Sequence, residues 1–389
     1  MNVQVAIAVV GTALTHFPAG PPRNIRGTAE ATTVWQQSRA AEWSLSSSPL
    51  VSIGGGSDPN EMLTRVVSVA RLRDGRILLW EPRPASVRLF AASGRLIRIF
   101  AREGAGPGEI RDAVWIGIAA DTILIHDRTQ RRLTRFRSAG DVLSTVPFRV
   151  SDDGQAYSVI GRWQSGTFIL RSLDAGFSGH RADGVRRDTA WLALADSGGS
   201  GLRRLVGFPG AATFTKATPN GGVYVNRQPF GADGLTAVGK DIVWVGDNAT
   251  PTVVGYDRVG QPRRRVVVPF ESTPVERRAA DARRQHELGA TRGAAVQALI
   301  NAKYAALPKT NPYYSGLGVA PDGDLWVTGF APYDQVGAEV AVLSPEGTVR
   351  ATLRLPARFR VVQVDANVVT GVYRDDDDAE FVRVYAIRR

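Results

Sequence analysis

The sequence predicts an all-β fold, a six-bladed β-propeller of four-stranded antiparallel blades with one helical-hairpin insertion. Three observations favour it. An acid, an aromatic residue and a glycine recur at a fixed spacing, short alternating apolar runs are bounded by Asp-Gly or Gly turns, and a helical pattern is confined to residues 271–311. Alternation of this kind between turn signals is typical of half-buried strands joined as hairpins.

The recurring spacing places an acid nine residues before an aromatic residue and a glycine four residues after it. Its three copies are Glu81, Phe90 and Gly94; Asp127, Phe136 and Gly140; and Asp247, Tyr256 and Gly260. Around the second copy the pattern predicts strands near 113–119, 122–127, 132–137 and 142–148. Each glycine supplies the positive φ that a tight hairpin between the third and fourth strands requires.

The number of units can be inferred from the intervals between these glycines. Gly94 and Gly140 are 46 residues apart, which is one unit, whereas the 120 residues from Gly140 to Gly260 suit two longer units. The last unit lacks one strand. We expect the apolar segment 49–53 to complete it, because closure removes the exposed edges of an open array. A seventh, degenerate unit within 175–235 remains an alternative.

The segment 271–311 is predicted to form the helical hairpin. Thr273, Pro274 and Glu276 match a capping box with proline at the first helical position. The helical pattern breaks between Gly289 and Gly293 and then resumes. The hairpin either packs on the propeller surface or serves as a lid or partner-docking arm.

The chain of 389 residues carries a net charge of +11 but has no dense basic tail. Basic residues are spread along strand-like stretches, so we interpret them as solvated strand faces and do not expect nucleic-acid binding. Cysteine is absent, which excludes disulfides and thiolate metal sites. We expect a monomer.

The N-terminal segment has two interpretations. The apolar run at 3–14 is too short to span a bilayer, and a Pro-, Arg-, Ser- and Thr-rich stretch follows it. One interpretation is a signal peptide over 1–20 and a flexible linker over 21–44, ahead of a propeller over 45–389. A periplasmic or secreted location then follows. The other is a frayed N-terminal strand.

The second unit resembles the NHL-repeat and TolB-like six-bladed propellers of bacteria. The residues that match the NHL pattern D-x-x-N-x-R-I-x-x-F-x-x-x-G are Asp127, Gln130, Arg132, Leu133, Phe136 and Gly140. The stretch REGAGPGEI at 102–110 is similar to a connector common in such propellers. The resemblance covers roughly residues 45–389 and implies the fold, but such propellers include scaffolds, lactonases and lyases, so it does not imply an activity.

No catalytic motif stands out. The chain has four histidines, two of them in the predicted leader and helical hairpin, so a three-histidine zinc centre is not expected. A G-x-S-x-G elbow is absent. The acidic run 375–378 lacks the spacing of an EF-hand and is interpreted as a solvated turn. No cofactor is identified, although a divalent cation is considered below.

Propeller topology places five residues, each just before an innermost strand, around one channel mouth. They are Glu61, Asp112, Asp153, Asp233 and Tyr314. Four carboxylates around one opening could hold a divalent cation or a cationic ligand, and the alternative is ordinary solvated loop acids. The same topology places the hairpin and the acidic run on that face.

The leading function predicted is non-enzymatic. An exported propeller would bind a protein, peptide or glycan partner through the face that carries the hairpin. The alternative is a metal-dependent small-molecule hydrolase, lactonase or lyase that acts at the channel mouth through those carboxylates.

Overall fold

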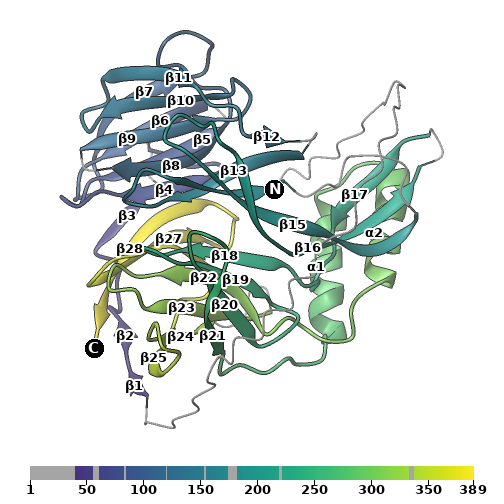
Figure 1. The fold of residues 1–389 in the computed structure, drawn as a ribbon. Coiled ribbons are helices and arrows are strands. Elements are labelled where there is room, and N and C mark those ends of the chain that lie inside the picture. The colour runs from purple at the N-terminus through teal and green to yellow at the C-terminus, as the bar shows by residue number, and fades with distance from the viewer. Residues whose placement is uncertain are drawn as a thin grey trace.

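The computed structural model describes residues 40–55, 61–82, 85–119, 121–152, 155–173, 182–218, 221–332 and 337–389. Antiparallel strands make up most of this part of the chain, and they form six sheets that follow one another along the sequence (Figure 1). We number the sheets one to six in that order. The predicted signal peptide over 1–20 and most of the predicted linker over 21–44 lie outside the described residues.

The first two sheets have four strands each. The first contains β4 (Ser68–Arg71), β5 (Ile77–Pro82), β6 (Ala85–Phe90) and β7 (Leu96–Arg102). The second contains β8 (Ala113–Ala119), β9 (Thr122–Asp127), β10 (Arg132–Arg137) and β11 (Val142–Pro147). The strands predicted for the second unit are therefore confirmed, with only the last one ending a residue early.

The third sheet has six strands, whereas the fourth has four. It contains β12 (Ser151–Asp152), β13 (Gln155–Arg162), β14 (Phe168–Ser172), β15 (Gly184–Ala195), β16 (Arg203–Ala217) and β17 (Val223–Arg227). The fourth contains β18 (Gly234–Val238), β19 (Val243–Asp247), β20 (Thr252–Tyr256) and β21 (Pro262–Val267). The strands β15 and β16 have 12 and 15 residues, so they account for much of the stretch 175–235, in which a seventh unit was considered. The described strands there belong to the third sheet, apart from the start of β18.

Short N-terminal strands complete the last two sheets. The fifth contains β22 (Tyr314–Val319), β23 (Leu325–Gly329), β24 (Glu339–Leu343) and β25 (Val349–Arg354), and β1 (Ala41–Glu42) joins its edge in parallel. The sixth contains β26 (Phe359–Val364), β27 (Val368–Arg374) and β28 (Glu380–Arg388), and β2 (Ser44–Leu45) and β3 (Val51–Ile53) pair with β28. The predicted pairing of segment 49–53 with the last unit is confirmed, whereas Ala41, Glu42 and Ser44, assigned to the linker, lie in strands.

The innermost strands of the sheets form a cycle. Each of β4, β8, β13, β18, β22 and β26 contacts the next in chain order, and β26 contacts β4. The side chain of Gln363 on β26 joins the first and last of them, since its Oε1 accepts a hydrogen bond from Arg71 N at 2.8 Å and its Nε2 donates to Arg71 O at 3.2 Å. One amide side chain thus satisfies the donor and the acceptor of a backbone that would otherwise lie at an edge.

The hydrophobic core is divided among the contacts between sheets. Each of six buried clusters joins two neighbouring sheets, and one of them brings Leu79 of the first sheet together with Val372 and Val382 of the sixth. This distribution follows from the strands themselves, which are apolar on both faces at positions such as Leu78 and Leu79.

The glycines of the recurring spacing adopt the predicted conformation. Gly94, Gly140 and Gly260 have φ values of 89°, 96° and 85°, and each lies in the turn between the third and fourth strands of its sheet. A side chain at any of them would be strained, so their recurrence in the sequence is explained by the hairpin geometry.

Two helices interrupt the strands between the fourth and fifth sheets: α1 (Arg277–Gly289) and α2 (Ala294–Ala305). The predicted capping box is wrong, because α1 begins after Glu276 with no side-chain cap. Pro274 instead forms an antiparallel bridge with Thr310, and Asn311 Nδ2 donates to Thr273 Oγ1 at 3.0 Å. We call residues 271–311 the helical arm.

Connections between antiparallel strands alternate between the two faces of the ring. The face that carries the helical arm, here the arm face, also holds the segments that lead into the inner strands and the turns between second and third strands. The opposite face holds the turns between first and second and between third and fourth strands. Neither helix of the described chain has the length and apolar content that a bilayer span requires.

Candidate functional site

Arginines pair with two of the predicted channel-mouth acids. Asp112 Oδ2 accepts hydrogen bonds from Arg128 Nη2 at 2.7 Å and Nε at 3.0 Å. Asp233 Oδ1 accepts one from Arg171 Nη2 at 3.2 Å, and its Oδ2 accepts one from Arg227 Nη1 at 2.6 Å. A cationic ligand at either carboxylate would therefore have to compete with a guanidinium that is already in place.

Of the other three predicted residues, one lies outside the described chain, and the other two do not contribute to a common site with Asp112 and Asp233. Glu61 is half-buried and forms no hydrogen bond or ion pair in the described chain, and Asp153 lies outside the described residues. Tyr314 is fully buried, and its hydroxyl donates to Thr252 O at 3.3 Å. Burial raises the pKa of Tyr314 above its ordinary value. The structure thus places Tyr314 in the core between the fourth and fifth sheets, which corrects its assignment to the channel mouth.

No ligand set for a metal ion is present in the described ranges, where no group of three or more His, Cys, Asp or Glu side chains converges. His126 lies on β9 with its ring centroid 5.1 Å from that of Phe148, and burial lowers its pKa to about 4. A neutral histidine packed edge-on against a phenylalanine serves the packing of the second and third sheets.

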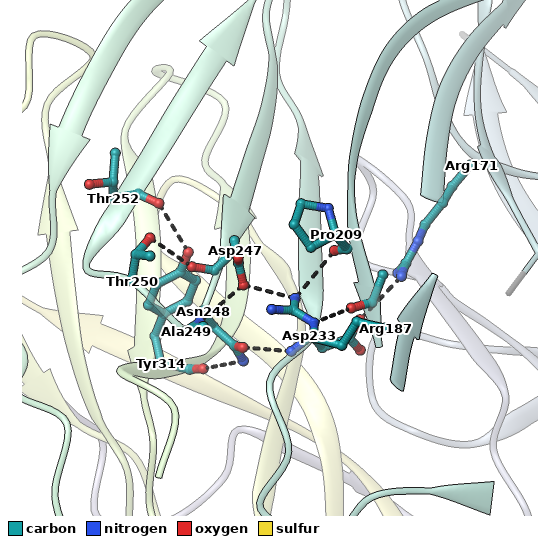
Figure 2. A network of polar contacts seen from close by, with 11 residues as sticks. Arg171, Arg187, Pro209, Asp233, Asp247, Asn248, Ala249, Thr250, Thr252 and Tyr314 are labelled. Atoms are coloured by element: carbon teal, nitrogen blue, oxygen red, sulfur yellow. Dashed lines mark hydrogen bonds and ion pairs between the residues drawn. The ribbon is translucent and has the colours of Figure 1, made fainter. Parts of the chain in front are cut away.

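A polar network on the arm face joins the third, fourth and fifth sheets (Figure 2). Asn248 Oδ1 accepts the backbone N–H of Asp233 at 2.6 Å, and its Nδ2 donates to Tyr314 O at 2.8 Å. Asp247 Oδ1 accepts Arg187 Nη2 at 2.8 Å, and Arg187 also donates to Pro209 O at 3.3 Å. This network fixes the backbone where the chain begins β18 and β22.

The acids of the recurring spacing have the same structural role in the first two sheets. Glu81 Oε1 accepts the N–H of Thr64 at 2.7 Å, and Asp127 Oδ2 accepts the N–H of Arg111 at 2.7 Å. Both acids are buried at the end of a second strand and hold the segment that leads into the inner strand. In the fourth sheet Asn248 takes this role. The acid of the recurring spacing therefore has a structural role, which is to hold the backbone just before an inner strand.

The helical arm is anchored to the third and fifth sheets. Gln228 Nε2 donates to two carbonyl groups at the end of α2, Lys303 O at 3.2 Å and Ala306 O at 3.0 Å. Arg283 on α1 lies over the ring of Phe230, 5.5 Å from its centroid, and Phe230 packs against Phe330. These contacts hold both helices against the ring, including α1, which has few apolar residues of its own.

A buried ion pair joins the two helices of the arm. Glu287 on α1 accepts a hydrogen bond from Lys303 Nζ at 2.6 Å and another from the Tyr304 hydroxyl at 2.8 Å. Burial and the neighbouring carboxylate raise the pKa of Tyr304, so its hydroxyl stays protonated and donates. Because both oxygens of Glu287 have partners, the arm has a rigid polar centre.

The arm reaches the sixth sheet, as the topology predicted. His286 Nε2 on α1 lies 3.6 Å from Asp378 Oδ2, in the turn that joins β27 to β28. Asp375 Oδ1 in the same turn accepts the N–H groups of Asp377 and Ala379, so the acidic run is a turn, as interpreted. The arm therefore extends over the arm face from the third sheet to the sixth.

A cavity of 380 Å³ opens between the fifth and sixth sheets on this face. Arg358, Arg360 and Arg374 contribute positive charge to its wall, and Glu380 contributes the one negative charge. Proline, alanine and valine side chains form most of the remaining wall. These arginines could not be predicted as cavity residues, because nothing in their spacing distinguishes them from the many arginines on strands.

Two further cavities, of 540 and 420 Å³, lie between inner strands and form parts of the central channel. The second shares Gly316, Thr328 and Val361 with the cavity between the sheets. That cavity therefore adjoins the central channel.

Comparison with known proteins supports the fold alone. No family model and no curated protein matches the sequence. A member of the DUF4221 family from Bacteroides vulgatus has a TM-score of 0.50 at 9% identity, and the match covers 90% of this chain and 100% of that one. The chain is a β-propeller.

Two other solved structures have lower scores. A candidate exported protein from Bacteroides fragilis matches with a TM-score of 0.47 at 12% identity over 89% of this chain and 96% of that one. Regucalcin from Agrobacterium tumefaciens, described as a calcium-binding protein, matches with a TM-score of 0.40 at 11% identity over 90% and 97%. At these identities the propeller's relatives carry no information about its ligand.

Proposed function

We propose that this chain is a non-enzymatic β-propeller of six blades that binds a protein, peptide or glycan partner through its arm face. The six sheets would be the blades, and the cycle of inner-strand contacts supports this count. The observation that carries the functional proposal is the helical arm, which extends across the arm face and contacts the acidic turn of the sixth sheet.

The arm offers charged side chains to a partner. Arg277 and Arg278 begin α1, and Arg292 lies between the helices; all three are exposed and form no ion pair or side-chain hydrogen bond in the described chain. Exposed guanidinium groups bind carboxylate, phosphate and sulfate groups of proteins and glycans. They therefore favour an acidic partner surface.

Retention of partners on immobilised protein tests the proposal. The native cell-envelope fraction would be passed over the wild type and over the double variant Arg277→Glu/Arg278→Glu, with a glycan array in parallel. We expect the variant to lose a partner that the wild type retains, with affinity weakened by about ten-fold or more, because two attractions become repulsions.

The matched control is Arg73→Glu/Arg137→Glu, which makes the same charge change at two exposed arginines of the opposite face. It should retain the partner as the wild type does. Equal retention by all three proteins would exclude the arm as the binding element.

Metal analysis tests the enzymatic alternative. A hydrolase, lactonase or lyase of the kind considered needs a bound divalent cation. A stoichiometric cation in untagged protein, together with a melting temperature that falls on chelation, would overturn the non-enzymatic proposal and favour the carboxylates at Asp112 and Asp233.

Export is part of the proposal and rests on the apolar run at 3–14. The mass and N-terminal sequence of the protein recovered from periplasm or medium test it. Recovery of the uncleaved chain from the cytoplasm alone would contradict export.

A further inference from the structure

One guanidinium group in the cavity between the fifth and sixth sheets makes no close polar contact. Arg360, the second residue of β26, forms no hydrogen bond or ion pair in the described chain, and the carboxylate of Glu380 acts on its charge only from a longer distance. Glu380 is occupied elsewhere. Its Oε1 accepts Arg374 Nη2 at 2.6 Å, and its Oε2 accepts the N–H of Val66 at 2.5 Å.

Protein surrounds this guanidinium although solvent can reach it. The side chain of Arg360 is exposed to water within the cavity, yet the crowding of protein atoms removes part of its hydration and lowers its pKa. Arginine stays charged far above neutral pH, so a positive charge with incomplete hydration faces the cavity. An anion that enters would restore the lost interactions.

The remaining wall favours an organic anion over an inorganic one. Pro332 and Pro356 lie on it, together with Val361 and Val372. A volume of 380 Å³ is in the range of small-molecule sites, which combine an apolar wall with a few polar groups that fix orientation. Phosphate would satisfy the charge but leave this apolar surface in contact with water.

We propose that this cavity binds a small organic acid, with its carboxylate on Arg360 and its apolar body against the proline and valine side chains. The planar guanidinium matches a carboxylate through two parallel hydrogen bonds. This ligand would lie beside the central channel, in a site that is separate from the exposed arginines of α1.

Fluorine NMR on the full chain tests the assignment, with 4-fluorobenzoate as the probe. We expect saturable binding to the wild type, about ten-fold weaker binding to Arg360→Gln, and an intermediate affinity for Arg360→Lys, which keeps the charge but loses the fork. The neutral isostere 4-fluorobenzamide should bind the wild type about ten-fold more weakly than the acid.

Arg137→Gln, on the opposite face, is the matched control and should bind the probe as the wild type does. Inorganic phosphate should displace the probe only weakly. The proposal is overturned if Arg360→Gln, with an unchanged melting temperature, binds the probe as tightly as the wild type. It is also overturned if 4-fluorobenzamide binds as tightly as 4-fluorobenzoate, or if phosphate displaces the probe as well as unlabelled benzoate does. If Arg360→Gln is unstable, the comparisons of Arg360→Lys with the wild type and of the amide with the acid decide the question.

Discussion

A buried histidine, His126, should make the stability of this propeller depend on pH. The folded protein lowers the pKa of His126 to about 4, whereas an unfolded histidine titrates near 6.5. Below pH 6.5 the unfolded chain binds a proton that the folded protein does not, so the free energy of unfolding should fall as the pH drops from 6.5 towards 4. The loss contributed by this group amounts to about 3 kcal/mol.

Denaturant unfolding of the wild type and of His126→Gln between pH 4 and pH 7 measures this dependence. The variant should show a flatter profile over that interval, even if it is less stable at pH 7 because the side chain packs less well against Phe148. Parallel profiles for the two proteins would contradict the assignment.

Residue identity predicted structural roles better than functional ones. The acid of the recurring spacing is visible in the sequence at Glu81 and Asp127, and both prove to hold the backbone before an inner strand. Tyr314 could not be predicted as buried, because the network that fixes it depends on Asn248, 66 residues away. No sequence pattern distinguishes Arg360. It has no ion pair because Glu380, the acid in the same cavity wall, accepts hydrogen bonds from Val66 and Arg374 instead.

At the scale of the element, the arm depends on one buried ion pair. Glu287→Gln leaves Lys303 buried with a neutral neighbour, and removal of one partner of a buried pair costs about 3–5 kcal/mol. We expect the helices α1 and α2 to open locally before the propeller unfolds. Hydrogen exchange of the arm amides relative to the strand amides measures this effect.

Asp281→Asn is the matched control on the same helix. Its ion pair with Arg284 is exposed, so its loss should cost at most about 1 kcal/mol and leave exchange of the arm nearly unchanged. Equal protection in Glu287→Gln and Asp281→Asn would show that the buried pair does not stabilise the arm.

Elements were predictable where local signals define both ends. The strands of the second sheet are bounded by turns that the sequence marks at each end, and they were located within one residue. The start of α1 was not, because a bridge between Pro274 and Thr310 competes with the local cap, and that contact spans the whole arm. The length of the strands β15 and β16 was also missed, since their outer halves are held by pairing with each other and by the pairing of β16 with β17, and no turn within them marks this pairing.

At the scale of the whole molecule, one amide side chain holds the first and last inner strands together. In Gln363→Ala both hydrogen bonds to the Arg71 backbone are lost, which should lower the free energy of unfolding by about 1–3 kcal/mol. Gln285→Ala, at an exposed position of α1, is the control and should change it little. Equal stability of the two variants in urea would contradict a role of Gln363 in closure.

The pairing of β3 with β28 also sets the time at which the molecule can finish folding. Ile53 pairs with Val382, so 329 residues must be added after Ile53 before its partner exists. At about 5–20 residues per second this takes about 16–66 s, and throughout that time β3 has no edge to join. Closure of the ring should therefore wait until β28 has been made, with the apolar strand Val51–Ile53 available to chaperones in the interval.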